Sequence, residues 1–168
     1  MSAVSIDAHI RYKESRWIMN FYLARHGEAV ADLIDPSRPL TRAGRDDVQR
    51  VARLAVEKAV QVSVIYHSGI LRARQTAEIF AEHLLPNGGT PVLSGLRPED
   101  DPSVVASELA VADSPLMLVG HLPHMNRLAC LLLDRGDAES EVINFAPAMM
   151  ACCVRENAIW KLSWTLEP

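Results

Sequence analysis

Short apolar runs alternate with longer amphipathic stretches along most of the chain. The apolar runs predict buried strands that begin at Met19, Val62 and Pro115. Between and after them, apolar side chains recur at helical spacing, which predicts helices over residues 41–59, 70–85, 103–111 and 124–134. The C-terminal part predicts two or three more strands, around residues 142–145, 149–154 and 159–164. Strands that alternate with helices predict an α/β fold, a three-layer α/β/α sandwich with a mostly parallel central sheet.

Residues 1–18 lack this regularity, because they carry mixed charges and no sustained apolar pattern. We expect them to form an N-terminal extension: a flexible tail, a short docking helix, or sequence upstream of the true translation start. We expect residues 19–168 to form one domain. The chain has 168 residues, of which 49% are hydrophobic, and this is enough for one well-filled core but not for two full domains.

Polar side chains follow each of the three predicted strands. The first strand ends at Arg25 and His26. Ser68 follows the second strand, with Arg72 just beyond it, and His121 follows the third. Because parallel strands end at the same edge of a sheet, and ligands bind outside that edge, we expect these side chains to converge on one site.

The residue types at this edge indicate phosphate chemistry. The ring of His26 could displace an alcohol or an amine from phosphorus, which would give a covalent phosphohistidine that water then hydrolyses. Arg25, Arg72 and His121 could stabilise the negative charge that spreads over the phosphoryl oxygens in the transition state. Gly27 would let the backbone pass close to a ligand, and the first amide groups of the next helix could point at the anion.

Charge and cysteine content disfavour several other classes of protein. The net charge of −4 and the pI of about 5.8 provide no basic field, so we expect no nucleic-acid partner. No apolar run approaches the roughly 18 residues of a membrane span, and the charged start of the chain predicts no ordinary signal peptide. Three cysteines, two of them adjacent, favour reduced thiols, and we expect a cytoplasmic protein without membrane association.

Four motifs appear in a characteristic order along the chain. They are Leu23-Ala24-Arg25-His26-Gly27-Glu28-Ala29, Arg38-Pro39-Leu40-Thr41 with Gly44, Ser68 followed by Arg72-Ala73-Arg74-Gln75-Thr76, and Gly120-His121-Leu122-Pro123. Any one of them alone would be weak evidence, since Arg-His-Gly occurs by chance in many proteins. Together they resemble the histidine phosphatase superfamily, whose fold is phosphoglycerate mutase-like. Over about Met19 to Trp164 the chain looks most like the short SixA-type phosphohistidine phosphatases of that family.

The resemblance implies a role for each matching residue. By it, His26 is the phosphorylated nucleophile, Arg25, Arg72 and His121 form the phosphate pocket, and no metal or other cofactor is required. The residues expected to contact substrate are Gly27, Arg38, Ser68 and Glu99. The chain has little room for the helical lid of larger members, so no large cap insertion is expected. An open site of this kind suits a phosphohistidine carried on a protein.

Two positions depart from the family pattern. Gly95 stands near the place where many members carry an acid that protonates the leaving group, and Glu99, Asp100 or Asp101 could substitute for it. Gly69 stands where a proline or an aspartate often follows the serine, and this should alter only the turn. Because imidazole leaves phosphorus more easily than an alkoxide does, a missing acid favours cleavage of an N–P bond.

The residues leave three alternatives open. The same mechanism could act on a small phosphorylated metabolite, such as a sugar phosphate or a nucleotide. The fold could also bind phosphate as a scaffold, without catalysis. A metal-dependent phosphatase could use His121, His124 and a cysteine, but Pro123 interrupts the spacing and no complete ligand set follows. We expect the other histidines and the cysteines to be structural.

Overall fold

The computed structural model describes residues 18–134 and 142–168. Its helices and strands follow one another in the order β1 (Ile18–Arg25), α1 (Arg42–Glu57), β2 (Val64–His67), α2 (Leu71–Leu84), α3 (Pro102–Val111), β3 (Leu116–Gly120), α4 (His124–Leu132), β4 (Met150–Glu156) and β5 (Ile159–Leu166). The alternation of strands and helices predicted from the sequence is confirmed.

The described strands form a five-stranded sheet in the order β2-β3-β1-β4-β5. Strands β1, β2 and β3 are mutually parallel, β4 is antiparallel to β1, and β5 is antiparallel to β4. Two reversals restore the original direction, so β5 runs the same way as β1. Among the described strands, β4 alone runs in the opposite direction. The sheet is therefore mostly parallel, as predicted, and its antiparallel pairs are those that β4 forms with β1 and β5.

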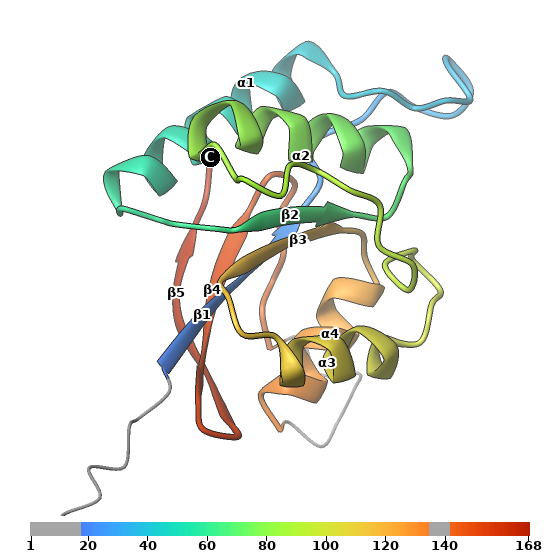
Figure 1. Ribbon diagram of the computed structural model, residues 1–168. Helices are drawn as coiled ribbons and strands as arrows, with labels where there is room; N and C mark the ends of the chain where they lie inside the picture. The colour runs from blue at the N-terminus through green and yellow to red at the C-terminus, as the bar shows by residue number, and fades with distance from the viewer. Residues whose placement is uncertain (1–17, 135–141) are drawn as a thin grey trace, which may run out of the picture.

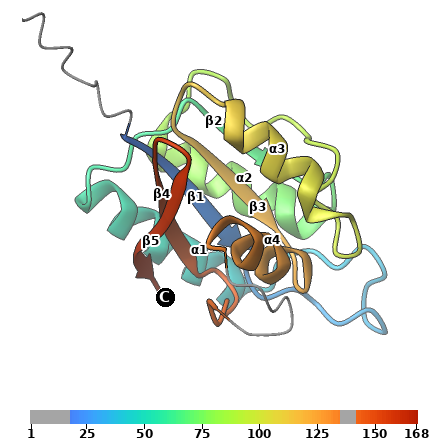
Figure 2. The same cartoon turned by 90° about the horizontal axis from the view of Figure 1, so that it is seen from below.

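The helices cover both faces of this sheet. Figure 1 shows α1 and α2 on one face and α3 and α4 on the other, and each pair of helices is in contact. Figure 2 gives the view onto the second face, with α3 and α4 in front of the strands. The predicted three-layer sandwich is therefore confirmed.

The alternation of side chains along β1 divides the core into two halves. Tyr22 and Ala24 pack in the half that α1 and α2 cover, whereas Phe21 and Leu23 pack in the half under α3 and α4. All four side chains are buried because β1 lies in the middle of the sheet and both of its faces are covered. This position explains why β1 is a continuous apolar run, and why the polar residues after it emerge at the centre of the sheet edge.

One predicted strand is wrong. Residues 142–145 are irregular, although Ile143 and Phe145 are buried in the half of the core under α3 and α4. The carbonyl oxygen of Phe145 accepts a hydrogen bond from Nη1 of Arg25, at 2.7 Å, instead of pairing with a strand. The apolar pattern of this segment therefore reflects burial rather than sheet pairing.

The predicted N-terminal extension falls almost entirely on residues 1–17, which lie outside the described residues. Ile18, the last residue assigned to it, instead begins β1 and pairs with Glu156. Among the described helices, none combines the length and the apolar character that crossing a membrane requires.

Candidate active site

The carboxyl ends of β1, β2 and β3 meet at one edge of the sheet, as the sequence predicts. The strand register places Arg25 beside Gly120 and His67 beside Val119, so the residues that follow these strands are neighbours. The ring centroids of His26 and His121 lie 4.9 Å apart. The polar strand ends therefore form one cluster.

Hydrogen bonds orient the ring of His26. Its Nδ1 lies 2.7 Å from the carbonyl oxygen of Gly27, and because a carbonyl can only accept, Nδ1 carries the proton. Nε2 then keeps its lone pair, which accepts a hydrogen bond from Nε of Arg72 at 3.2 Å. Burial lowers the pKa of His26 to about 4, and the nearby charges of Arg72 and Arg25 contribute to this lowering. Near pH 7 the ring is neutral, and the lone pair of Nε2 is available for nucleophilic attack.

His121 is almost fully buried and joins two of the strand ends. Its Nε2 lies 2.6 Å from Oγ of Ser68, and the same oxygen accepts a hydrogen bond from the backbone N–H of Ile70 at 3.3 Å. Burial and, to a smaller extent, the proximity of His26 and Arg72 lower the pKa of His121 to about 3. His121 is therefore neutral near pH 7 and can offer one N–H group to a ligand.

Two polar atoms of the cluster have no partner. Within the described part of the chain, Nε of Arg25 and Nδ1 of His121 are buried and make no hydrogen bond. A buried polar group without a partner costs about 1–3 kcal/mol. A ligand rich in acceptor oxygens would satisfy the Arg25 donor, so the cluster fits an anion such as phosphate.

Two residues of α2 hold the cluster together, and our sequence analysis did not identify this role. Oγ1 of Thr76 accepts a hydrogen bond from the N–H of Gly27 at 3.1 Å and donates one to the carbonyl of Arg72 at 2.8 Å. Oε1 of Gln75 accepts a hydrogen bond from the N–H of Leu40 at 2.8 Å. These bonds fix the segments after β1 to the helix that carries Arg72. The only signal in the sequence was their place in the same motif as Arg72.

Gly27 is required for packing, in addition to the close approach to a ligand that the sequence predicts. A Cβ atom at this position would lie 2.8 Å from the carbonyl oxygen of Gly44, in the first turn of α1. The N–H of Gly27 is bonded to Thr76 and its carbonyl oxygen to His26. Both backbone groups are thus occupied within the protein, and a contact between Gly27 and substrate stays a prediction.

Arg38 lies at the base of the loop that follows β1. The two ends of this loop, Ala29 and Leu40, form a β-bridge, and Nε of Arg38 donates to the carbonyl of Val30 at 3.1 Å. The charge of Arg38 contributes to lowering the pKa of His26 and, after burial, that of Arg72. The guanidinium is therefore near the cluster, where it would attract an anion.

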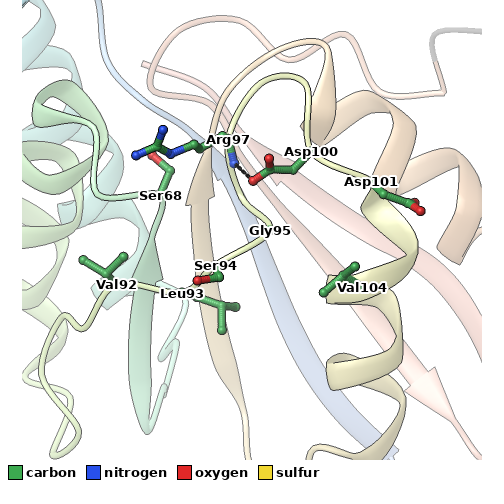
Figure 3. Close-up of a pocket in the computed structure, with 9 residues that line it drawn as sticks. All are labelled: Ser68, Val92, Leu93, Ser94, Gly95, Arg97, Asp100, Asp101 and Val104. Carbon is green, nitrogen blue, oxygen red and sulfur yellow. Dashed lines mark hydrogen bonds between the residues drawn. The ribbon is translucent and has the colours of Figure 1, made fainter.

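A cavity of about 500 Å³ opens beside Ser68, under the loop that leads to α3 (Figure 3). Gly95 lines this cavity in a left-handed conformation, with φ of +90°, and supplies no side chain there. Arg97 also lines it, and Figure 3 shows the guanidinium group of Arg97 directed toward Ser68. Because this cavity is open space next to Ser68 of the cluster, we refer to it as the leaving-group side of the site.

None of the three acids considered as substitutes for the missing acid is free in this cavity. Asp100 and Asp101 line it, but their carboxylates accept hydrogen bonds at 2.9 Å from the backbone N–H groups of Arg97 and Ser103, respectively. The bonds from Ser103 lower the pKa of Asp101, which caps α3. Glu99 is exposed, and its carboxylate lies 3.7 Å from Arg127. The structure does not bring Glu99 to the cluster, so its contact with substrate stays a prediction.

Metal and thiol chemistry have little support in this structure. Among the described residues, no group of three or more histidine, cysteine and acidic side chains is placed to hold a metal ion. Burial raises the pKa of the Cys152 thiol to about 11 and that of Cys153 to about 12, so neither is a thiolate near pH 7. His124 is fully buried at the start of α4, away from solvent.

Comparison with known proteins agrees with this geometry. Residues 21–93 match the sequence model of the histidine phosphatase superfamily (branch 1). An uncharacterized protein of Picosynechococcus sp. is 38% identical over 119 residues, which make up 66% of this chain and 71% of that protein. The phosphohistidine phosphatase SixA of Escherichia coli is 26% identical over 155 residues, or 89% of this chain and 94% of that protein.

Solved structures show the same likeness. The protein histidine phosphatase SixA complexed with tungstate matches with a TM-score of 0.80 at 25% identity, covering 89% of this chain and 97% of that one. A phosphoglycerate mutase from Plasmodium falciparum shares the fold, with a TM-score of 0.64 at 16% identity. On this evidence the chain belongs to the histidine phosphatase superfamily, within which it is of the SixA type, and it is a phosphatase.

Proposed function

We propose that this phosphatase hydrolyses phosphohistidine on a protein through a covalent phosphohistidine intermediate on His26. The orientation of the His26 ring is the main support, because Nδ1 donates to the carbonyl of Gly27 and Nε2 is left unprotonated beside Arg72. The likeness to the phosphohistidine phosphatase SixA supports the choice of substrate.

In the first step, Nε2 of His26 forms a bond to phosphorus while the bond between phosphorus and the substrate's imidazole nitrogen breaks. A substrate ring that already carries a proton on its other nitrogen leaves as neutral imidazole and needs no acid from the protein. In the second step, water attacks the same phosphorus, the bond from Nε2 to phosphorus breaks, and inorganic phosphate leaves. This sequence is compatible with the absence of a side chain at Gly95.

Arg25, Arg72 and His121 would stabilise the phosphoryl group in flight. The planar guanidinium groups bind pairs of oxygens and stay charged at any physiological pH. His121 contributes a neutral N–H while the site is empty, and an arriving dianion would raise the pKa of its ring. Fixed donors of this kind act mainly in the transition state, when charge is spread over the equatorial oxygens.

A small phosphorylated metabolite is the second candidate substrate. The cavity beside Ser68, at about 500 Å³, could take a sugar or a nucleobase as the leaving group. Such esters release an alkoxide, which depends more on an acid than imidazole does. The two candidate substrates therefore differ in how strongly their hydrolysis needs an acidic side chain at the position of Gly95.

The test compares the purified chain with His26→Ala in the presence of a strong chelator. We expect wild-type protein to release phosphate from phosphoimidazole and from a histidine-phosphorylated protein faster than from sugar phosphates, and radiolabel to be trapped on His26. His26→Ala should lose roughly 10⁴-fold or more of the activity while keeping its circular dichroism spectrum. His83→Ala is the matched control. His83 lies near the C-terminal end of α2, where its ring is hydrogen-bonded to Gln49 of α1.

Four results would contradict the proposal. Retained turnover in His26→Ala would exclude the covalent step, and loss of wild-type activity in chelator would indicate a metal. Faster hydrolysis of a sugar phosphate or nucleotide than of phosphohistidine would favour the metabolite. Binding of phosphate without turnover of any substrate would indicate that the protein is a non-catalytic, phosphate-binding scaffold.

A further inference from the structure

Two large apolar side chains stand exposed at the tip of the loop formed by residues 29–40. Leu33 is 100% exposed and Ile34 is 80% exposed. Single exposed apolar residues are common on protein surfaces and need no explanation. Two adjacent ones, beside a phosphate pocket, suggest a surface that another molecule covers.

The loop presents this pair in an ordered turn. The N–H of Ile34 donates to the carbonyl of Ala31 at 2.9 Å, and the carboxylate of Asp35 accepts hydrogen bonds from both the N–H and the hydroxyl of Ser37. At the base, the N–H of Val30 donates to the carbonyl of Pro39 at 2.8 Å. Because the turn is already ordered, a partner that buries the pair would lose little conformational entropy.

The same loop borders the phosphate pocket. It begins three residues after His26, and its far end is fixed to α2 by the bond between Leu40 and Gln75. Arg38, at its base, is close enough for its charge to lower the pKa of His26. Figures 1 and 2 both show this blue loop projecting beyond the sheet edge where β1 and β3 end. A molecule that contacts Leu33 while its phosphoryl group contacts His26 must therefore cover the surface of this loop.

Exposed apolar side chains also lie at the cavity next to the site. Val92 and Val104 line the cavity beside Ser68, and both are more than half exposed. Figure 3 shows their side chains on opposite sides of the cavity. We define Leu33, Ile34, Val92 and Val104 as the apolar rim. The rim has one pair on the loop after β1 and one pair at the cavity.

We propose that the apolar rim docks a folded protein that carries apolar side chains on both sides of its phosphorylated histidine. This inference rests on the proposed function and extends it, because it names the surface that surrounds the phosphohistidine. A metabolite that fills the cavity would leave Leu33 and Ile34 in water, whereas a protein surface can cover both pairs at once. Burial of apolar area supplies the affinity, and the arginines supply the recognition of the phosphoryl group.

The test uses two forms of one designed helical carrier protein with a single surface histidine, phosphorylated with phosphoramidate. One form has leucines flanking the histidine on the helix surface, and the other has serines at the same positions. The enzyme variants are Leu33→Ser with Ile34→Ser and, as matched control, Val111→Ser with Ile159→Ser. The control residues are also exposed, and they lie near the amino end of β3 and in the β4–β5 hairpin, at the opposite end of the sheet.

We expect wild-type protein to have a KM for the leucine form about tenfold below that for the serine form. The rim variant should lose most of this difference, while the control variant keeps it. Phosphoimidazole, which is too small to reach the loop, should be turned over by all variants within about twofold, which checks that the pocket is intact. Equal KM values for both carriers in wild type, or an unchanged preference in the rim variant, would overturn the inference.

Failure of the proposed function has a different signature. If phosphoimidazole and both carriers are stable in wild-type protein, the phosphohistidine activity is wrong. Calorimetric binding of the two phosphorylated carriers then still decides the docking surface, since a rim-dependent preference for the leucine form supports it and equal binding removes it.

Discussion

The phosphate side and the leaving-group side of the site are built in different ways. On the phosphate side, His121 is buried and His26 and Arg72 are partly buried, and hydrogen bonds connect them to residues after two strands and to α2. On the leaving-group side, a cavity is lined by Gly95 and by carboxylates that already accept backbone hydrogen bonds. The hydrogen-bonded order is thus concentrated around His26, whereas the two acids that line the cavity already take part in backbone hydrogen bonds.

The largest effect expected after loss of His26 comes from Arg72. Arg72→Ala should lower kcat/KM by roughly 10²–10³-fold, because it removes a donor to the phosphoryl oxygens and to Nε2 of His26. Arg72→Lys keeps the charge but not the planar fork, and should recover only a small part of the loss. Steady-state kinetics with phosphoimidazole and with an aryl phosphate would measure both variants. If the loss of kcat/KM in Arg72→Ala differs strongly between phosphoimidazole and the aryl phosphate, Arg72 also acts on the leaving group, and the division between the two sides of the site is wrong.

The pH dependence of kcat/KM should report the lowered pKa of His26. Its pKa of about 4 lies below the ordinary value of 6.5, so the free ring stays neutral and nucleophilic between these values. We expect kcat/KM to fall about tenfold per pH unit only below about pH 4, as the ring is protonated. The unfolded chain takes up the proton first, so the free energy of unfolding should decrease as the pH falls from 6.5 toward 4.

A stable substrate, buffers of constant ionic strength, and circular dichroism at each pH would separate this kinetic limb from acid unfolding. A limb near pH 6.5 in folded protein would mean that His26 is not shielded as the structure indicates.

The smallest effect is expected on the leaving-group side. Gly95→Glu would place a carboxylate in the cavity and should raise hydrolysis of an alkyl phosphate, relative to phosphoimidazole, by several-fold. Gly95→Ala is the matched control, because both variants carry a Cβ at a φ of +90° and lose about 1 kcal/mol of stability. The ratio of the two substrate rates is the measurement. An equal ratio in both variants would show that this side of the site does not control the leaving group.

The pattern of the sequence predicted the layers, the strands before each polar strand end, and the cluster of His26, Arg72 and His121. These followed from local regularities, since periodicity gives elements and parallel strands share an edge. It did not predict the bond from Gly27 to Thr76, because a single hydrogen bond across 49 residues leaves no periodic trace. The strand predicted at residues 142–145 is wrong because a buried irregular segment and a buried strand can have the same run of apolar residues.

The leaving-group side was harder to predict than the phosphate side. A run of acids at Glu99, Asp100 and Asp101 looked like a choice of proton donors. In the structure, helix capping and turn formation use two of these carboxylates, and the third lies near Arg127. Local backbone bonds of this kind depend on loop geometry, which residue types alone do not determine.

The bond between Arg25 and Phe145 has a consequence for the order in which the protein matures. Nη1 of Arg25 and the carbonyl of Phe145 are 120 residues apart in sequence, and the backbone of His26 also pairs with Ala148. A nascent chain that has delivered β1, α2 and β3 still lacks this support for its phosphate pocket. Because such long-range contacts form late, the pocket should become complete only after the segment around Ala148 has left the ribosome.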